Sequence, residues 1–110
     1  MAKMRLTPQQ VELVAERFRA LAEPARLHLL IALRDGERSV GELVEVTGLA
    51  TANVSKHLQQ LYGAGYVTRR KEGLFVLYGL DGTHVMKLCD LMCGQLEAEA
   101  EAQRKLFASK

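Results

Sequence analysis

The chain has 110 residues, a length that predicts one domain with a single modest core and little room for an enzyme's pocket. Its composition, 48% hydrophobic and 25% charged, argues against a disordered chain, and no apolar run approaches the ~18 residues that a membrane-spanning helix needs. A net charge of +2 is too small to identify a polyanionic partner, so the placement of the basic residues must decide that question.

Two helices open the chain. Thr7, Pro8 and Gln10 supply a hydroxyl N-cap, a proline at the first helical position and an amide three residues after the cap, which predict a helix over 8–21. Pro24 begins a second helix whose apolar residues are dense enough to predict a central place in the core. These residues are Leu27, Leu29, Leu30, Ile31 and Leu33.

A helix-turn-helix is predicted over 39–62. Ser39 and Glu42 repeat the capping pattern, and Gly48 can end a short helix in a left-handed conformation. A further helix follows from about Thr51 to Tyr62. One small core between the two helices would fix their angle, and it would contain Val40, Leu43, Val44, Leu49, Val54, Leu58 and Leu61.

The opposite face of this second helix carries amides, hydroxyls and a lysine but no carboxylate. Asn and Gln can pair with adenine in the major groove, and Lys can meet guanine or a phosphate. The candidate DNA-binding residues are Thr51, Ala52, Asn53, Ser55, Lys56, Gln59 and Gln60. His57 lies at the edge of the buried face, so we expect it to brace the turn, and His28 to have a similar structural role.

A β-hairpin is predicted over 66–80, with a glycine at its tip. The basic run Arg69, Arg70 and Lys71 is expected to separate two strand-forming segments and to reach a phosphate backbone beside the groove, as a DNA-binding wing does. Asp81 or Thr83 can then cap a last, long helix over 83–107.

LAEPARLHLLIAL (21–33) and VGELVEVTGLATANVSKHLQQLYGAGYVTRRKEGLFVLYGL (40–80) resemble the ArsR/SmtB family of bacterial winged-helix repressors. The resemblance implies a mainly α winged helix-turn-helix with a β-hairpin wing, as a single domain over 1–110. It also implies a homodimer built on the helices 8–21 and 83–107, which binds double-stranded operator DNA and releases it when an inducer binds. The family often has a serine N-cap where this chain has Ala50, so Thr51 is expected to cap instead.

At the positions where the family usually carries its sensor sites, this sequence lacks most of the ligand residues. Leu43-Val44-Glu45-Val46 stands where family sensors carry a cysteine pair, and valine cannot bind a metal. Of the family's carboxylate and imidazole positions along the last helix, only His84 matches, because Gly82, Gln95 and Ala98 stand at the others. A four-ligand zinc site cannot be assembled from that remnant.

Cys89 and Cys93 are the two cysteines of the chain, and Met86 falls on the same shoulder of the helical wheel. They could bind a thiophilic ion such as Cu(I), Hg(II) or trivalent arsenic, As(III), with Met86 or a donor from a dimer partner. They could also act as a redox switch, although an i, i+4 pair within one helix is poorly placed for a disulfide. Finally, they could be small apolar residues in a dimer interface.

We therefore predict a cytoplasmic, dimeric DNA-binding repressor and no enzyme, because neither a phosphate-binding glycine loop nor a placed acid–base pair is recognisable. The N-terminal segment has no apolar signal core, and two cysteines suit a compartment where thiols stay reduced. The alternative is a winged-helix protein-interaction module without DNA binding, in which the cysteines are purely structural.

Overall fold

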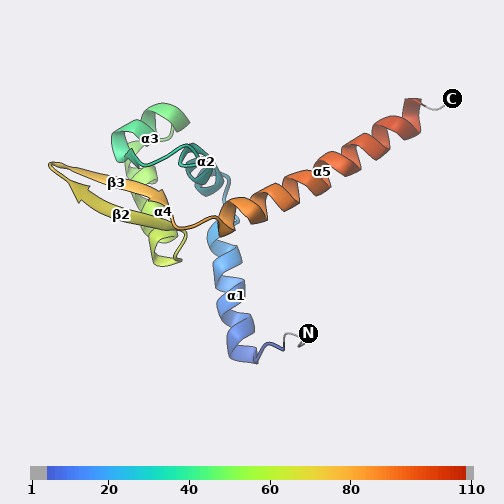
Figure 1. The fold of residues 1–110 in the computed structure, drawn as a ribbon, viewed down its shortest axis with the longest axis horizontal. Helices are drawn as coiled ribbons and strands as arrows, with labels where there is room; N and C mark the ends of the chain where they lie inside the picture. The colour runs from blue at the N-terminus through green and yellow to red at the C-terminus, as the bar shows by residue number, and fades with distance from the viewer. Residues whose placement is uncertain (1–4, 109–110) are drawn as a thin grey trace.

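The computed structural model describes residues 5–108. Figure 1 shows a body of short helices and a hairpin, from which two longer helices project. The elements in chain order are α1 (Pro8–Leu21), α2 (Pro24–Ala32), β1 (Arg38–Ser39), α3 (Val40–Thr47), α4 (Thr51–Gly63), β2 (Val67–Glu72), β3 (Phe75–Leu80) and α5 (His84–Ala108). This is the predicted order of helices and hairpin, with the short strand β1 added.

The predicted helix starts at Thr7 and Ser39 are confirmed as capping boxes. The Gln10 backbone N–H donates to Thr7 Oγ1 at 3.1 Å, and the Thr7 N–H donates to Gln10 Oε1 at 2.8 Å. Ser39 and Glu42 form the same reciprocal pair, which holds the pKa of the Glu42 carboxyl below its usual value through the Ser39 hydrogen bonds. Local sequence alone therefore sets where α1 and α3 begin.

The three strands form an antiparallel sheet in the order β1-β3-β2. Glu72 pairs with Phe75, which leaves only Gly73 and Leu74 in the hairpin turn. Gly73 has a φ of +60°, as the first central residue of a type II′ turn requires. The expectation that the basic run separates two strands is wrong, because the backbone of these residues pairs with β3 and the run lies inside β2.

The core forms where α2, α3, α4, the sheet and the first turn of α5 meet. Its buried side chains are Leu29, Leu30, Leu33, Leu43, Val54, Leu58, Leu61, Val67, Tyr78, Val85 and Met86. Ile31 was predicted to join them, and that prediction is wrong: its side chain is 55% exposed. Leu30 and Leu33 face inward, and Ile31 is turned ~100° away from Leu30 along the helix.

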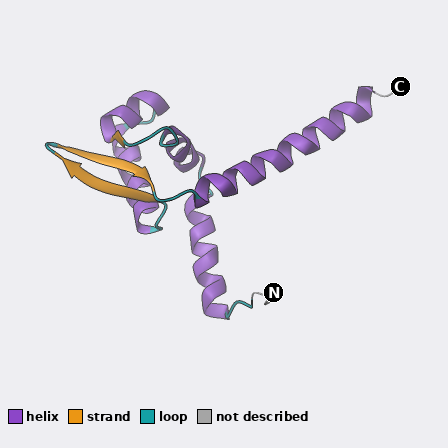
Figure 2. Cartoon of the chain, viewed as in Figure 1, coloured by secondary structure: helices purple, strands orange, loops and turns teal. Residues whose placement is uncertain are grey.

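α1 and α5 project from the body (Figure 2), and much of their apolar surface is uncovered. No residue of α1, which lies wholly in the described range, is fully buried, and in the 25 residues of α5 only Val85 and Met86 are. The exposed apolar side chains are Val11, Leu13, Val14 and Phe18 on α1, and Leu88, Leu91, Met92, Leu96, Leu106 and Phe107 on α5. None of the helices in residues 5–108 is long and apolar enough to cross a membrane.

Candidate nucleic-acid interface

α3 and α4 form the helix-turn-helix predicted from the sequence. Gly48 ends α3 with a φ of +74°, and Leu43 of α3 is buried with Val54 and Leu58 of α4. The expectation that Thr51 caps α4 is wrong, because Ala50 holds the cap position and its carbonyl accepts the first helical bond from the Val54 N–H at 3.0 Å. The recognition helix α4 therefore begins without a side-chain cap.

The outer face of α4 brings the candidate base-reading residues together. Thr51, Ala52, Asn53, Lys56, Gln59 and Gln60 are exposed, and Ser55 is half-buried at the margin of this face. The buried face, with Val54, Leu58 and Leu61, points the other way into the core. The arrangement offers a surface of hydrogen-bonding groups with a single positive charge, which suits the edges of bases in a major groove.

Arg26 of α2 connects the recognition helix α4 to the end of α1. Its Nε donates to Nδ1 of His57 on α4 at 3.1 Å, and its Nη1 donates to the Ala20 carbonyl at the end of α1 at 3.3 Å. His57 was expected to brace the turn between the two helices, but its hydrogen bond is with Arg26 of α2. His28, for which a similar structural role was expected, is exposed on α2. Sequence reasoning missed Arg26, because its partner lies 31 residues away and no local pattern announces it.

The three basic residues of β2 divide between the two faces of the hairpin. Side chains alternate along a strand, so Arg69 and Lys71 share one face and Arg70 lies on the other. The Arg69 guanidinium lies over the ring of Tyr62, 4.4 Å from its centroid, which attaches β2 to the end of α4. Within the described residues, neither Arg69 nor Lys71 forms an ion pair, so both keep an uncompensated positive charge beside the recognition helix.

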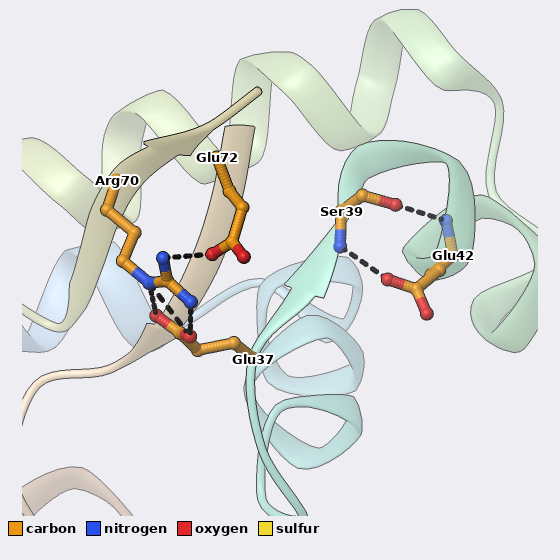
Figure 3. Close-up of polar contacts among 5 residues, drawn as sticks. All are labelled: Glu37, Ser39, Glu42, Arg70 and Glu72. Atoms are coloured by element: carbon orange, nitrogen blue, oxygen red, sulfur yellow. Dashed lines mark hydrogen bonds and ion pairs between the residues drawn. The ribbon is translucent and has the colours of Figure 1, made fainter. Parts of the chain in front are cut away.

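Arg70 is held by carboxylates of the protein itself (Figure 3). Its Nε donates to Glu37 Oε2 at 2.9 Å, its Nη2 donates to Glu37 Oε1 at 2.8 Å, and its Nη1 donates to Glu72. The hydrogen bond from Arg70 lowers the pKa of the Glu37 carboxyl, and both carboxylates raise the pKa of Arg70. Arg70 therefore differs from its two neighbours, since Glu72 of the wing and Glu37 before β1 compensate its charge.

The two cysteines lie on α5 in different surroundings. Cys89 is half-buried against the core, and Cys93, one turn later, is exposed; both are free thiols. Burial raises the pKa of the Cys89 thiol, and the neighbouring Cys93 and Asp90 act in the same direction. Arg34 binds Asp90 at 2.5 Å and ties this part of α5 to the segment after α2.

Met86 follows the same shoulder of the helix as the cysteines, and the sequence favoured a core position for it over a ligand role; the structure confirms the core position, at 7% exposure. α5 leaves the body after its first turns (Figure 1), so one face of the helix is covered at Met86 and open ~10 Å further along at Cys93. His84 is exposed at the start of α5. Across residues 5–108, no group of three or more His, Cys, Asp and Glu side chains could hold a metal ion.

Comparison with known proteins identifies regulators as relatives. The sequence model of the protein family described as "Bacterial regulatory protein, arsR family" matches residues 23–69. HTH-type transcriptional regulator KmtR of Mycobacterium tuberculosis is 42% identical over 83 residues, which are 76% of this chain and 64% of KmtR. The probable mercury resistance operon repressor of Streptomyces lividans is 42% identical over 71 residues, 64% of this chain and 57% of the repressor. The chain thus spans about three fifths of the length of these two relatives.

Two further matches cover a larger share of the similar protein. HTH-type transcriptional regulator NmtR of Mycobacterium tuberculosis is 38% identical over 85 residues, 77% of this chain and 71% of NmtR. The solution structure of the homodimeric winged helix-turn-helix DNA-binding domain of Mb0332 from Mycobacterium bovis, a possible ArsR-family transcriptional regulator, has a TM-score of 0.77. It is 30% identical, and the match covers 93% of this chain and 95% of that one. Together with the helix-turn-helix and the wing, these similarities show that the chain belongs to the ArsR family of bacterial regulatory proteins.

Proposed function

We propose that this protein is a homodimeric, sequence-specific DNA-binding transcriptional repressor. The outer face of α4 carries the proposal, because it is exposed, hydrogen-bonding and free of carboxylates, and Arg69 and Lys71 extend its positive charge along the wing. Asn53, Ser55, Lys56 and Gln59 would contact bases or nearby phosphates, with Thr51, Ala52 and Gln60 at the margins. Membership of a family whose relatives are named transcriptional regulators supports the same function.

Binding would place α4 in the major groove, with the wing beside it on the phosphate backbone. A two-fold dimer presents two such helices to successive major grooves on one side of the duplex. The operator should therefore be an imperfect inverted repeat with half-sites about one helical turn apart. Arg70 would contribute less to this binding than its neighbours, because Glu37 and Glu72 already hold its charge.

The test begins with selection of binding sites from a random duplex library, followed by anisotropy titration of the selected duplex. Lys56→Ala should weaken binding and leave the thermal midpoint almost unchanged, because Lys56 is exposed and outside the core. Lys105→Ala, which removes an exposed lysine near the end of α5, is the matched control and should retain the affinity. If Lys56→Ala binds the selected duplex as tightly as the native protein does, the outer face of α4 is not the recognition face.

The exposed apolar side chains of α1 and α5 support a homodimer through these two helices. Val11, Val14 and Phe18 on α1 are 41–55% exposed, and Leu91, Met92 and Leu96 of α5 are 57–74% exposed. Uncovered apolar surface of this extent is typical of an interface between proteins. The homodimeric state of the similar Mb0332 domain supports the same assembly.

Light scattering after size exclusion should report a dimer for the native chain and a monomer for Phe18→Glu, because a charge at the centre of the α1 stripe would be desolvated without a partner. Glu12→Lys changes charge on α1 outside the apolar set and serves as the control. A native chain that remains monomeric at high concentration would contradict the dimer.

We further propose that Cys89 and Cys93 form the sensor, acting in the cytoplasm, where thiols stay reduced. Two thiols one turn apart suit soft ions such as Cu(I) or Hg(II), and As(III) would need a third thiolate from the partner protomer. The chain's similarity to a mercury resistance repressor supports a thiophilic inducer. Thiol oxidation is the competing chemistry, and the exposure of Cys93 makes it accessible to an oxidant.

Operator release should be measured with Cu(I), Hg(II), As(III) and a peroxide, on the native protein and on Cys89→Ser/Cys93→Ser. If an ion or peroxide releases the native protein from operator DNA but does not release the double variant, that agent is assigned as the inducer. Unchanged release in the double variant would remove the cysteines from sensing. Should no duplex bind with affinity that depends on salt and on sequence, the protein-interaction module becomes the better interpretation.

A further inference from the structure

The tip of the wing is apolar, which is unusual for the most exposed point of a hairpin. We define the wing tip as Gly73, Leu74 and Phe75. Leu74 is 99% exposed, the highest value for a large apolar side chain in the described residues, and Phe75 is 65% exposed. In Figure 1 this tip points away from all the helices, and the exposures of Leu74 and Phe75 show that residues 5–108 leave it uncovered.

The wing tip is also held in a fixed conformation. Only Gly73 and Leu74 connect the two strands, and the positive φ of Gly73 closes a tight turn. The backbone of this turn is too short for Leu74 to fold back on the body. At the base of the tip, Arg70 holds Glu72 together with Glu37. Arg70 thereby links the base of the tip to Glu37 and offsets part of the negative charge of Glu72, and the cluster of one arginine and two carboxylates keeps a net charge of −1.

The charges around the wing tip indicate which class of partner it can bind. Lys71 and Arg69 follow the same hairpin toward α4 and carry uncompensated positive charge, which favours a polyanion over a neutral protein surface. Two side chains are also too small a patch for a stable protein interface. In contrast, proteins that bind the minor groove use one or two apolar side chains as a wedge between base steps.

Resting on the DNA-binding function proposed above, we propose that the wing tip enters the minor groove beside the half-site, where Leu74 wedges against a base step and bends the duplex. Phe75 would lie against the sugars of the groove wall, while Lys71 meets the phosphates at its edge. Specificity outside the major-groove contacts would then come from deformability, with a preference for flexible pyrimidine–purine steps under the tip.

The test compares Leu74→Ser/Phe75→Ser with Lys71→Gln on a duplex selected from a random library by the native protein. The serine variant should bind about tenfold more weakly at every salt concentration, because it loses apolar burial and no phosphate contact. Lys71→Gln should instead reduce the slope of log affinity against log salt. Energy transfer between dyes at the duplex ends should report a bend of at least about 20° for the native protein and a smaller one for the serine variant.

Two controls make the result specific. Leu74→Met keeps an apolar tip and should retain both affinity and bend, and the thermal midpoints of all variants should match, since neither side chain lies in the core. Exchanging A·T for inosine·cytosine pairs under the tip changes the major-groove pattern but keeps the minor-groove one, so affinity should survive it.

Native affinity and an unchanged bend in the serine variant would overturn the minor-groove wedge while leaving the proposed repressor intact. A serine variant that loses self-association by light scattering, but bends DNA normally, would equally overturn it and assign the patch to contact between copies. If the native protein selects no duplex at all, both the wedge and the DNA-binding function fail.

Discussion

Removing Arg70 together with Glu37 should leave the salt dependence of DNA binding unchanged, whereas removing Lys71 should reduce it. Among the described residues of the wing, the cations that no carboxylate compensates are Arg69 and Lys71, and Lys56 of α4 lies beside them without an ion pair. Three such cations in each protomer make six in a dimer, and at ~0.9 for each phosphate neutralised the slope of log affinity against log salt should be about −5.

Anisotropy titrations over an about fourfold range of salt should show the native affinity falling roughly a thousandfold. Lys71→Gln removes two of the six contacts from the dimer, so the same range should cost it only about a hundredfold. Glu37→Gln/Arg70→Gln removes one positive and one negative charge, keeps the net charge and should retain the native slope. A slope that falls as much in this double variant as in Lys71→Gln would show that Arg70 reaches DNA and would refute the division of the basic run.

Three other predictions follow from burial and ionisation. Leu58→Ala should lower the free energy of unfolding by about 2–5 kcal/mol, measured by urea titration, because Leu58 is fully buried and its loss leaves a cavity. Glu37 has a lowered pKa in the folded state, so its stabilising effect is present above about pH 4.3 and is lost as the pH falls through the lowered value. The urea midpoint should therefore fall less on acidification in Glu37→Gln than in the native protein, and equal acid dependence would contradict this. Iodoacetamide should modify Cys93 before Cys89, because Cys93 is exposed whereas burial raises the pKa of the Cys89 thiol. Mass spectrometry of partly labelled protein measures this order, and earlier labelling of Cys89 would contradict the prediction.

The features that the sequence predicted correctly depend on residues close together in the chain. Thr7 and Ser39 mark the starts of α1 and α3 because a capping box is complete within four residues, and Gly48 ends α3 by its own backbone freedom. The buried and outer faces of α4 follow from a periodicity that repeats every turn. The helix-turn-helix and the candidate recognition face could therefore be derived before any coordinates were known.

The wrong and missed features depend on how the elements meet. β1 is too short to have a periodicity of its own and exists only because β3 lies beside it, and Ile31 is exposed because no element covers that face of α2. For Met86 the sequence favoured the core but left a third sulfur donor open, and the departure of α5 from the body between Met86 and Cys93 decided for the core.

The division of the basic run shows the same limit at the candidate site. The sequence by itself determined that three consecutive cations follow the recognition helix. The pairing of this run with β3 placed it in a strand, and strand alternation then points the middle cation away from its two neighbours. Only the tertiary structure decided that Glu37, 33 residues earlier, stands where Arg70 points. Charge in a sequence is a local property, but compensation of that charge depends on the distance between side chains, and the packing of the sheet against the helices sets that distance.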